Sequence, residues 1–225
     1  WYQKRKLAKN KSISNIYLKE FFETRIKLLS PFAPFFCEEI WEIMGNNSFI
    51  SLASWPEADG SKITLKTEDN ERLIQDTIID IHKIIKVTKM IPKKIMIYTS
   101  SAMKYILYKK LLNRIQSQST ANFGVLMKEF VNDNEIKDFV KQNPELVKKM
   151  IDDILSESLE VRCRRTKIDS FDELIPLQDA RSLLISEIGN DQLEVNIFSE
   201  DSSDKYDPKQ KSKYARPFKP AIFIE

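Results

Sequence analysis

The chain has 225 residues, of which 42% are hydrophobic and 31% are charged, and its formal net charge is +3. This composition is typical of a soluble globular protein with one large or two modest cores, and no apolar run is long enough to span a membrane. No signal-peptide pattern is present, and a content of only four glycines argues against a glycine-rich phosphate loop.

The small net charge conceals an uneven distribution. Residues 1–11 carry five cations and no acid, and residues 205–219 carry six cations and a single acid, Asp207. The rest of the chain is therefore acidic. Two basic segments in an otherwise acidic chain indicate either a polyanionic partner that binds at these segments or two solvated, lysine-rich tails. Because the first residue is Trp1 and the sequence there is typical of the middle of a helix, we expect the chain to be a piece of a larger one.

A helical hairpin is predicted over the first part of the chain. Apolar residues recur at helical spacing from Leu18 to Leu29 and again after Pro34. Pro31 should end the first helix, because the residue before a proline avoids the helical region. Pro34 suits the first turn of the second helix, and Gly45 suits its C-terminal end. The acidic side chains of this second helix are expected on its outer surface: Glu38, Glu39 and Glu42.

The remainder of the chain predicts helices combined with short strands. The apolar spacing and the proline positions favour helices over 68–90, 107–115, 120–131, 134–142, 144–154 and 177–188. Alternating or β-branched runs predict strands over 93–100, 193–197 and 220–225. Residues 156–169 fit neither pattern clearly, and residues 199–218 form a polar, basic excursion between the last two strands.

These elements predict a mixed α and β fold in two parts. Residues 1–66 should form an all-α, bundle-like portion, and residues 67–225 a small α/β (α+β) domain with a short sheet. The helix expected over 68–90 lies at the junction and could bridge the two parts.

No residue pattern predicts catalysis or metal binding. His82 is the only histidine, so neither a metal cluster nor a serine–histidine triad can be assembled around it. Cys37 and Cys163 are far apart in sequence, and we expect neutral thiols. Adjacent acids such as Asp152 and Asp153 point in different directions on a helix and should be solvated. We therefore predict a binding part without catalytic residues, metal or cofactor of its own.

The basic excursion is the strongest candidate for a binding surface. Its cations alternate with aromatic residues, which is typical of RNA contacts because cations neutralise phosphates and aromatic rings stack on unpaired bases. The alternative is that Tyr214 and Phe218 anchor the loop to the sheet while the lysines are merely solvated. The candidate RNA-binding residues here are Lys209, Lys211, Lys213, Tyr214, Arg216 and Lys219.

A second basic patch falls in the ambiguous segment 156–169 and contains Arg162, Arg164 and Arg165. If this segment is extended, Arg162 and Arg164 share one face and Arg165 lies on the other, so only part of the patch can face RNA. The basic run of residues 1–11 is a third candidate, or simply the exposed face of a helix.

Several motifs resemble one family. The segment LLSPFAPFFCEEIWEIMG (28–45), followed by Ser54–Pro56, resembles the class I aminoacyl-tRNA synthetases for leucine, isoleucine and valine. In that family a Leu-Leu-x-Pro-Phe-x-Pro turn precedes a Glu-Glu-x-Trp helix; a polar residue usually follows the second proline, where Phe35 stands here. The start WYQKRK and the ending YDPKQKSKYARPFKPAIFIE (206–225) resemble the archaeal-type leucyl-tRNA synthetases, and this resemblance covers essentially the whole chain.

The resemblance implies a specific role. Residues 1–66 would be the end of the anticodon-binding bundle, and residues 67–225 the C-terminal domain that contacts the long variable arm of leucine tRNA. The parent enzyme would be a cytoplasmic ligase that uses ATP with magnesium. The signatures of its catalytic domain are absent here, so the chain alone should be inactive.

The expected partners are leucine tRNA and the catalytic domain of the same parent chain, with neither a membrane nor DNA. The alternatives are the tail of a valyl- or isoleucyl-tRNA synthetase and a stand-alone RNA-binding or protein-interaction module.

Overall fold

The computed structural model describes residues 1–117, 123–168, 171–189 and 192–225. These residues form two compact units, Trp1–Ile63 and Thr64–Glu225. The first unit contains helices, and the second combines helices with a small sheet, so the predicted mixed α and β fold is confirmed. The roles predicted for residues 1–66 and 67–225 stay predictions.

The first unit contains the predicted helical hairpin. Its elements are α1 (Tyr2–Leu7), α2 (Asn15–Leu29), α3 (Pro34–Ile43) and two 3₁₀ turns, η1 (Ile50–Leu52) and η2 (Gly60–Lys62). The first long helix ends two residues before Pro31, and Pro34 is the first residue of α3. Gly45 follows α3 with a φ of 88°, a left-handed conformation that glycine adopts without steric cost. The prolines and this glycine therefore set the ends of the helices as predicted.

The core of the first unit forms where α2, α3 and η1 meet, and its buried residues are Ile26, Cys37, Trp41 and Ile50. Burial raises the pKa of the Cys37 thiol, which therefore stays neutral as expected. Glu38, expected on the outer surface of α3, is half-buried. Its carboxylate accepts the backbone N–H of Ile50 at 2.8 Å, because the chain after α3 folds back over that helix.

The second unit contains the remaining helices. They are α4 (Leu65–Thr88), α5 (Ala102–Ser117), α6 (Phe123–Phe130), α7 (Lys137–Gln142), α8 (Pro144–Ser156), α9 (Leu159–Thr166), α10 (Leu174–Asp179), α11 (Arg181–Ile188) and the 3₁₀ turn η3 (Ser212–Tyr214). The ambiguous segment 156–169 is thus helical over most of its described part. The single helix expected over 177–188 is two short helices that meet at Ala180. Part of the helix expected over 120–131 lies outside the described residues.

The sheet has the strand order β2–β1–β3. Central strand β1 (Lys94–Thr99) is parallel to β2 (Glu194–Ser199) and antiparallel to β3 (Ala221–Ile224). Parallel neighbours require a long crossover, and here the crossover carries helices α5 to α11. All three predicted strands are therefore confirmed.

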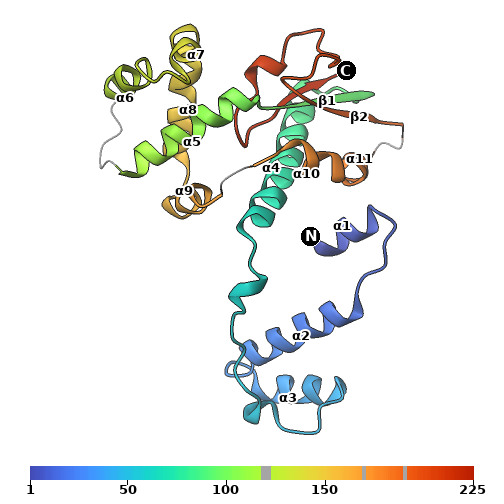
Figure 1. Ribbon diagram of the computed structural model, residues 1–225. Helices are drawn as coiled ribbons and strands as arrows, with labels where there is room; N and C mark the ends of the chain where they lie inside the picture. The colour runs from blue at the N-terminus through green and yellow to red at the C-terminus, as the bar shows by residue number, and fades with distance from the viewer. Residues whose placement is uncertain (118–122, 169–170, 190–191) are drawn as a thin grey trace. The chain divides into compact units, whose positions relative to one another are not determined.

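The two faces of the sheet have different coverings. Helices α4, α10 and α11 pack against one another, and α10 and α11 also contact β2; α4 runs beneath the sheet in Figure 1. Met96 and Tyr98 point to the face opposite Ile95 and Ile97, because side chains alternate along a strand. On that face they pack against Ala215, which belongs to the basic excursion. The excursion is thus a covering layer of the sheet.

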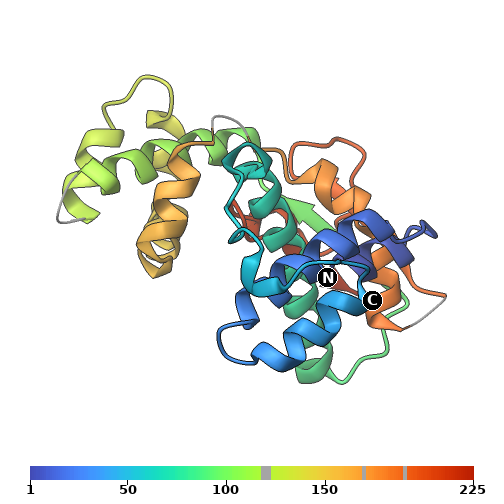
Figure 2. The ribbon, with the colours of Figure 1, turned by 90° about the horizontal axis from the view of Figure 1, so that it is seen from below.

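A second apolar cluster lies away from the sheet. Helix α5 runs outward from the end of β1, and α6, α7 and α8 gather around its far part (Figure 1 and Figure 2). Leu107, Leu111, Leu126 and Ile151 are among its buried residues. Phe218, from the basic excursion, packs into the same cluster. The excursion therefore joins the helical cluster to the sheet.

Candidate nucleic-acid interface

The basic excursion leaves β2 at Ser199 and returns to the sheet at Ala221. Its middle contains a tight turn over 207–214, which we call the basic turn. The Asp207 carboxylate accepts the backbone N–H groups of Lys211 at 2.7 Å and Ser212 at 2.9 Å. An Asp that bonds its own backbone a few residues onward is a common turn-forming device. It closes the basic turn around Lys209 and Lys211.

Tyr98 fixes the start of the basic turn from the sheet. Its hydroxyl donates to the backbone carbonyl of Tyr206 at 2.6 Å. Burial, followed by the neighbouring Asp207 carboxylate, raises the pKa of Tyr98, so the hydroxyl remains a donor at physiological pH. Burial also opposes ionisation of Asp207, but the hydrogen bonds from Ser212 and Lys211 outweigh it and leave the pKa of Asp207 lowered. Asp207 is therefore ionised when it holds the turn.

Three lysines lie exposed on the basic turn: Lys209, Lys211 and Lys213. Within the described part of the chain, none of them makes an ion pair with an acid. The ring of Tyr214 is 52% exposed and lies 5.8 Å from the Lys211 ammonium and 5.3 Å from that of Lys213. The turn therefore combines exposed cations with an exposed aromatic side chain.

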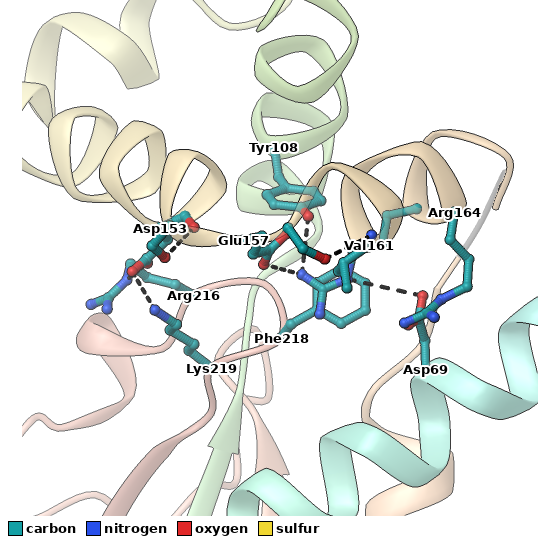
Figure 3. A network of polar contacts seen from close by, with 12 residues as sticks. Asp69, Tyr108, Asp153, Glu157, Val161, Arg164, Arg216, Phe218 and Lys219 are labelled. Carbon is teal, nitrogen blue, oxygen red and sulfur yellow. Dashed lines mark hydrogen bonds and ion pairs between the residues drawn. The ribbon is translucent and has the colours of Figure 1, made fainter. Parts of the chain in front are cut away.

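Two further cations near the end of the excursion share one acid. Arg216 and Lys219 both bind the carboxylate of Asp153 on α8, each at 2.5 Å. Their backbones pair across a tight turn, with the Arg216 N–H donating to the Lys219 carbonyl at 3.0 Å. Asp153, predicted to be a solvated surface acid, is instead the partner that partly neutralises both cations (Figure 3).

The turn between these two cations has Phe218 at its inner corner. Phe218 adopts a φ of 63°, a left-handed conformation that is unfavourable for a residue with a side chain. Its ring is buried against Tyr105, Tyr108 and Phe171. Its backbone N–H donates to the buried carboxylate of Glu173. Of the two aromatic residues considered for the loop, Phe218 thus anchors it while Tyr214 stays exposed.

The second predicted basic patch is helical, not extended, and two of its arginines point into the protein. Arg164 binds Asp69 of α4, with its Nη2 atom 2.6 Å from the carboxylate. Arg165 is only 6% exposed and binds both Glu157 and the hydroxyl of Tyr108. Arg162, on the same helix, is partly exposed. The assignment of faces made for an extended segment therefore does not apply, and α9 presents Arg164 and Arg165 to internal acids.

Several residues that shape this region carry no local signal in the sequence. Asp69 lies 95 residues from Arg164, and Lys104 lies 96 residues from its acidic partner Glu200. Glu173 is buried and accepts N–H groups from Ser100 and Phe218. Only Asp207 could have been found from sequence, because Tyr-Asp-Pro is a turn-forming combination.

The described residues offer neither a metal-binding cluster nor a membrane-spanning helix. They contain no group of three or more histidine, cysteine or acidic side chains that could hold a metal ion. None of the helices they form is long and apolar enough to cross a bilayer. His82 lies exposed on α4.

Comparison with known proteins gives this surface a context. Residues 2–102 match the family described as the anticodon-binding domain of tRNA ligases. The leucine–tRNA ligase of Methanococcoides burtonii is 37% identical over 227 aligned residues, which cover the whole chain and 22% of that protein. The chain is a homologue of archaeal leucine–tRNA ligases. The leucine–tRNA ligase of Methanocaldococcus jannaschii is 32% identical over 92% of this chain and 19% of its own length.

A further relative, the leucine–tRNA ligase of Pyrococcus abyssi, is 31% identical over the whole chain and 21% of that protein. The predicted resemblance to archaeal-type leucyl-tRNA synthetases is thereby confirmed. The chain spans about a fifth of the length of the curated relatives that it matches. The basic turn lies outside residues 2–102, in a part of the chain that the alignment with the Methanococcoides burtonii leucine–tRNA ligase covers.

Proposed function

We propose that this chain is the tRNA-binding part of a leucine–tRNA ligase, and that its second unit contacts the long variable arm and the body of leucine tRNA. The observation that carries the proposal is the basic turn of Lys209, Lys211, Lys213 and Tyr214, whose cations are exposed and unpaired among the described acids. The similarity along the whole chain to archaeal leucine–tRNA ligases supports the choice of leucine tRNA.

The chemistry of this turn suits a structured RNA. Each lysine that neutralises a phosphate releases a bound counterion, so affinity should fall steeply as salt rises. Tyr214 offers a ring on which an unpaired base can stack, an interaction worth about 1–3 kcal/mol. Phosphate contacts set position and affinity, whereas base contacts carry selectivity. In this proposal the lysines hold the RNA backbone and Tyr214, with the backbone around it, reads the unpaired tip of the arm.

The other predicted RNA-binding residues take different places in the proposal. Arg216 and Lys219 lie beside the basic turn and can reach phosphates only in competition with Asp153. Arg164 and Arg165 are assigned to internal ion pairs, so we leave them out of the interface. Arg162 remains a candidate at the periphery.

We also propose that the parent ligase supplies the chemistry. A catalytic domain of the same full-length chain would activate leucine with ATP and magnesium and transfer it to the tRNA. The match of residues 2–102 to the anticodon-binding family supports an origin of the first unit in the helical bundle of such an enzyme. We expect the 225-residue chain alone to bind tRNA without aminoacylating it.

A titration with three RNAs tests the proposal. The chain is titrated at several salt concentrations with leucine tRNA, with the same tRNA carrying a trimmed variable arm, and with valine tRNA. The proposal predicts tightest binding of the intact leucine tRNA. Equal binding of all three would contradict variable-arm recognition and leave this surface a general electrostatic contact. Absence of salt-dependent binding would contradict the tRNA-binding role altogether.

A further inference from the structure

A buried lysine lies directly under the basic turn. Lys104, near the start of α5, is only 3% exposed. Its ammonium donates to the carboxylate of Glu200 at 2.9 Å, to the carbonyl of Lys213 at 2.8 Å and to the carbonyl of Ala215 at 2.7 Å. An ammonium has three N–H donors and no acceptor, so these three partners use its full capacity.

The arrangement joins three separate segments of the second unit. Glu200 follows β2 directly, and its carboxylate also accepts the backbone N–H of Ser101 at 3.2 Å, next to the start of α5. A buried charge is tolerated only when it is paired and hydrogen-bonded. Burial lowers the pKa of Lys104, while Glu200 acts in the opposite direction. The lysine therefore makes two of its bonds to the end of the basic turn, one to Lys213 within it and one to Ala215 directly after it, and these bonds hold that segment in place.

The two carbonyls that Lys104 holds stand on either side of Tyr214. Ala215 is fully buried against Met96 and Tyr98 of the sheet. Lys213 and Tyr214, which directly precede Ala215, have exposed side chains. With the carbonyls on both sides tied inward, the short backbone segment of Lys213–Ala215 leaves the lysine and tyrosine side chains facing solvent.

We infer that Lys104 is a positioning residue for RNA binding, which fixes the backbone on both sides of Tyr214 so that the stacking ring and its flanking cations are arranged before RNA arrives. Lys104 itself contacts no RNA, because it is buried. This inference rests on the proposed function of the basic turn. It adds a residue that the surface charge alone does not reveal.

Replacement of Lys104 by methionine tests the inference. The change keeps an unbranched apolar stem of similar length and removes all three hydrogen bonds. If only about a tenth of the variant molecules then hold the turn in its binding-competent conformation, the affinity for leucine tRNA falls about tenfold. The dependence of affinity on salt should keep its slope, because every lysine that faces phosphate is still present.

A second readout needs no RNA. Hydrogen exchange followed by mass spectrometry should show faster exchange in peptides that cover 207–215 of Lys104→Met, with unchanged exchange in peptides of α4. The double variant Lys104→Met, Glu200→Gln guards against a general loss of structure, because it removes the carboxylate charge that the single variant leaves unpaired. It should show the same local change and the same loss of affinity.

Lys110→Met is the matched control. It makes the same chemical change on the same helix and removes ion pairs with Asp133 and Glu135, which lie away from the basic turn. We expect its tRNA affinity to stay within about twofold of the original and its exchange over 207–215 to stay unchanged; a tenfold loss in Lys110→Met would overturn the specific role of Lys104.

The outcomes separate the inference from the function on which it rests. Salt-dependent tRNA binding by the original chain, with unchanged affinity in Lys104→Met, would overturn the positioning role alone. Unchanged exchange over 207–215 would overturn it as well. An original chain that shows no salt-dependent binding would overturn the proposed function, and with it the RNA role of Lys104.

Discussion

The guanidinium carbon of Arg165 lies 3.5 Å from the centre of the Phe218 ring. This contact joins α9 to the corner of the basic excursion. A cation over an aromatic face is stabilised by the ring quadrupole, the more so when both groups are desolvated, and both residues are buried here. An arginine that the sequence predicts to bind RNA is thus an internal support of the neighbouring loop.

Arg165→Ala should therefore act on folding. It leaves the carboxylate of Glu157, which is 17% exposed, without its partner. Removing one member of a buried pair costs about 3–5 kcal/mol. Chemical denaturation should give a free energy of unfolding that is lower by roughly that amount. Arg162→Ala, on the same helix, is the control and should change stability by less than about 0.5 kcal/mol. Comparable stability of the two variants would contradict the internal role of Arg165.

Phe218 provides a test of backbone strain. Replacement by alanine or glycine removes the buried ring and should cost about 3–5 kcal/mol. Glycine normally destabilises relative to alanine, but at a φ of 63° alanine suffers a clash that glycine avoids. We predict that Phe218→Gly is more stable than Phe218→Ala by about 1 kcal/mol. Thermal or chemical unfolding of the two variants measures the difference in stability. If Phe218→Ala were the more stable variant, the left-handed conformation of residue 218 would be contradicted.

Asp153 should weaken RNA binding in the unmodified chain. Its carboxylate holds Arg216 and Lys219, and a phosphate would have to displace it. Asp153→Asn removes that competing charge and should raise the affinity for leucine tRNA several-fold at low salt, with a steeper salt dependence. Asp152→Asn, the adjacent exposed acid, makes the same change of net charge and is the control. Equal effects of the two substitutions would mean that only net charge matters.

The Asp207 carboxylate should make the basic turn sensitive to acid. Its pKa is lowered in the folded chain, so its contribution to stability is complete above the ordinary pKa of an aspartate, about 3.9. That contribution is lost as the pH falls through the lower folded value. The difference in free energy of unfolding between the original chain and Asp207→Asn should therefore be largest near neutral pH and should disappear in acid. A gap that stays constant with pH would contradict ionisation of Asp207 as the cause.

Local sequence signals predicted much of the fold. Pro31, Pro34 and Gly45 act on their own neighbours in the chain, so the ends of α2 and α3 could be derived from residue types alone. The strands and long helices were predictable for the same reason, since burial of one face imposes a period on the sequence. The helical state of α9 was not, because Val161 and Arg165 are its only buried residues and one of them is charged.

The candidate site was predictable only in outline. The position of a basic turn with an aromatic residue follows from the sequence of residues 205–219, but the different surroundings of Tyr214 and Phe218 do not. The burial of Phe218 is decided by contacts with Tyr105 and Tyr108 of α5, which lie far away in the sequence. The same holds for Arg164, whose partner Asp69 lies on α4. Long-range pairing of charges leaves no period in the sequence.

The measurement that tests the central claim most directly is the salt dependence of tRNA binding with the three exposed lysines of the basic turn removed. Lys209, Lys211 and Lys213 are replaced together by alanine, and the affinity for leucine tRNA is measured at several salt concentrations. A matched control replaces Lys148, Lys149 and Lys137, which are other lysines of the second unit that lie on α8 and α7.

If the basic turn holds the RNA backbone, the triple variant binds more weakly and its plot of log affinity against log salt loses about 0.7–0.9 in slope per phosphate contact removed. The control variant should keep most of the original slope. An unchanged slope in the basic-turn variant, with an intact fold, would contradict the account.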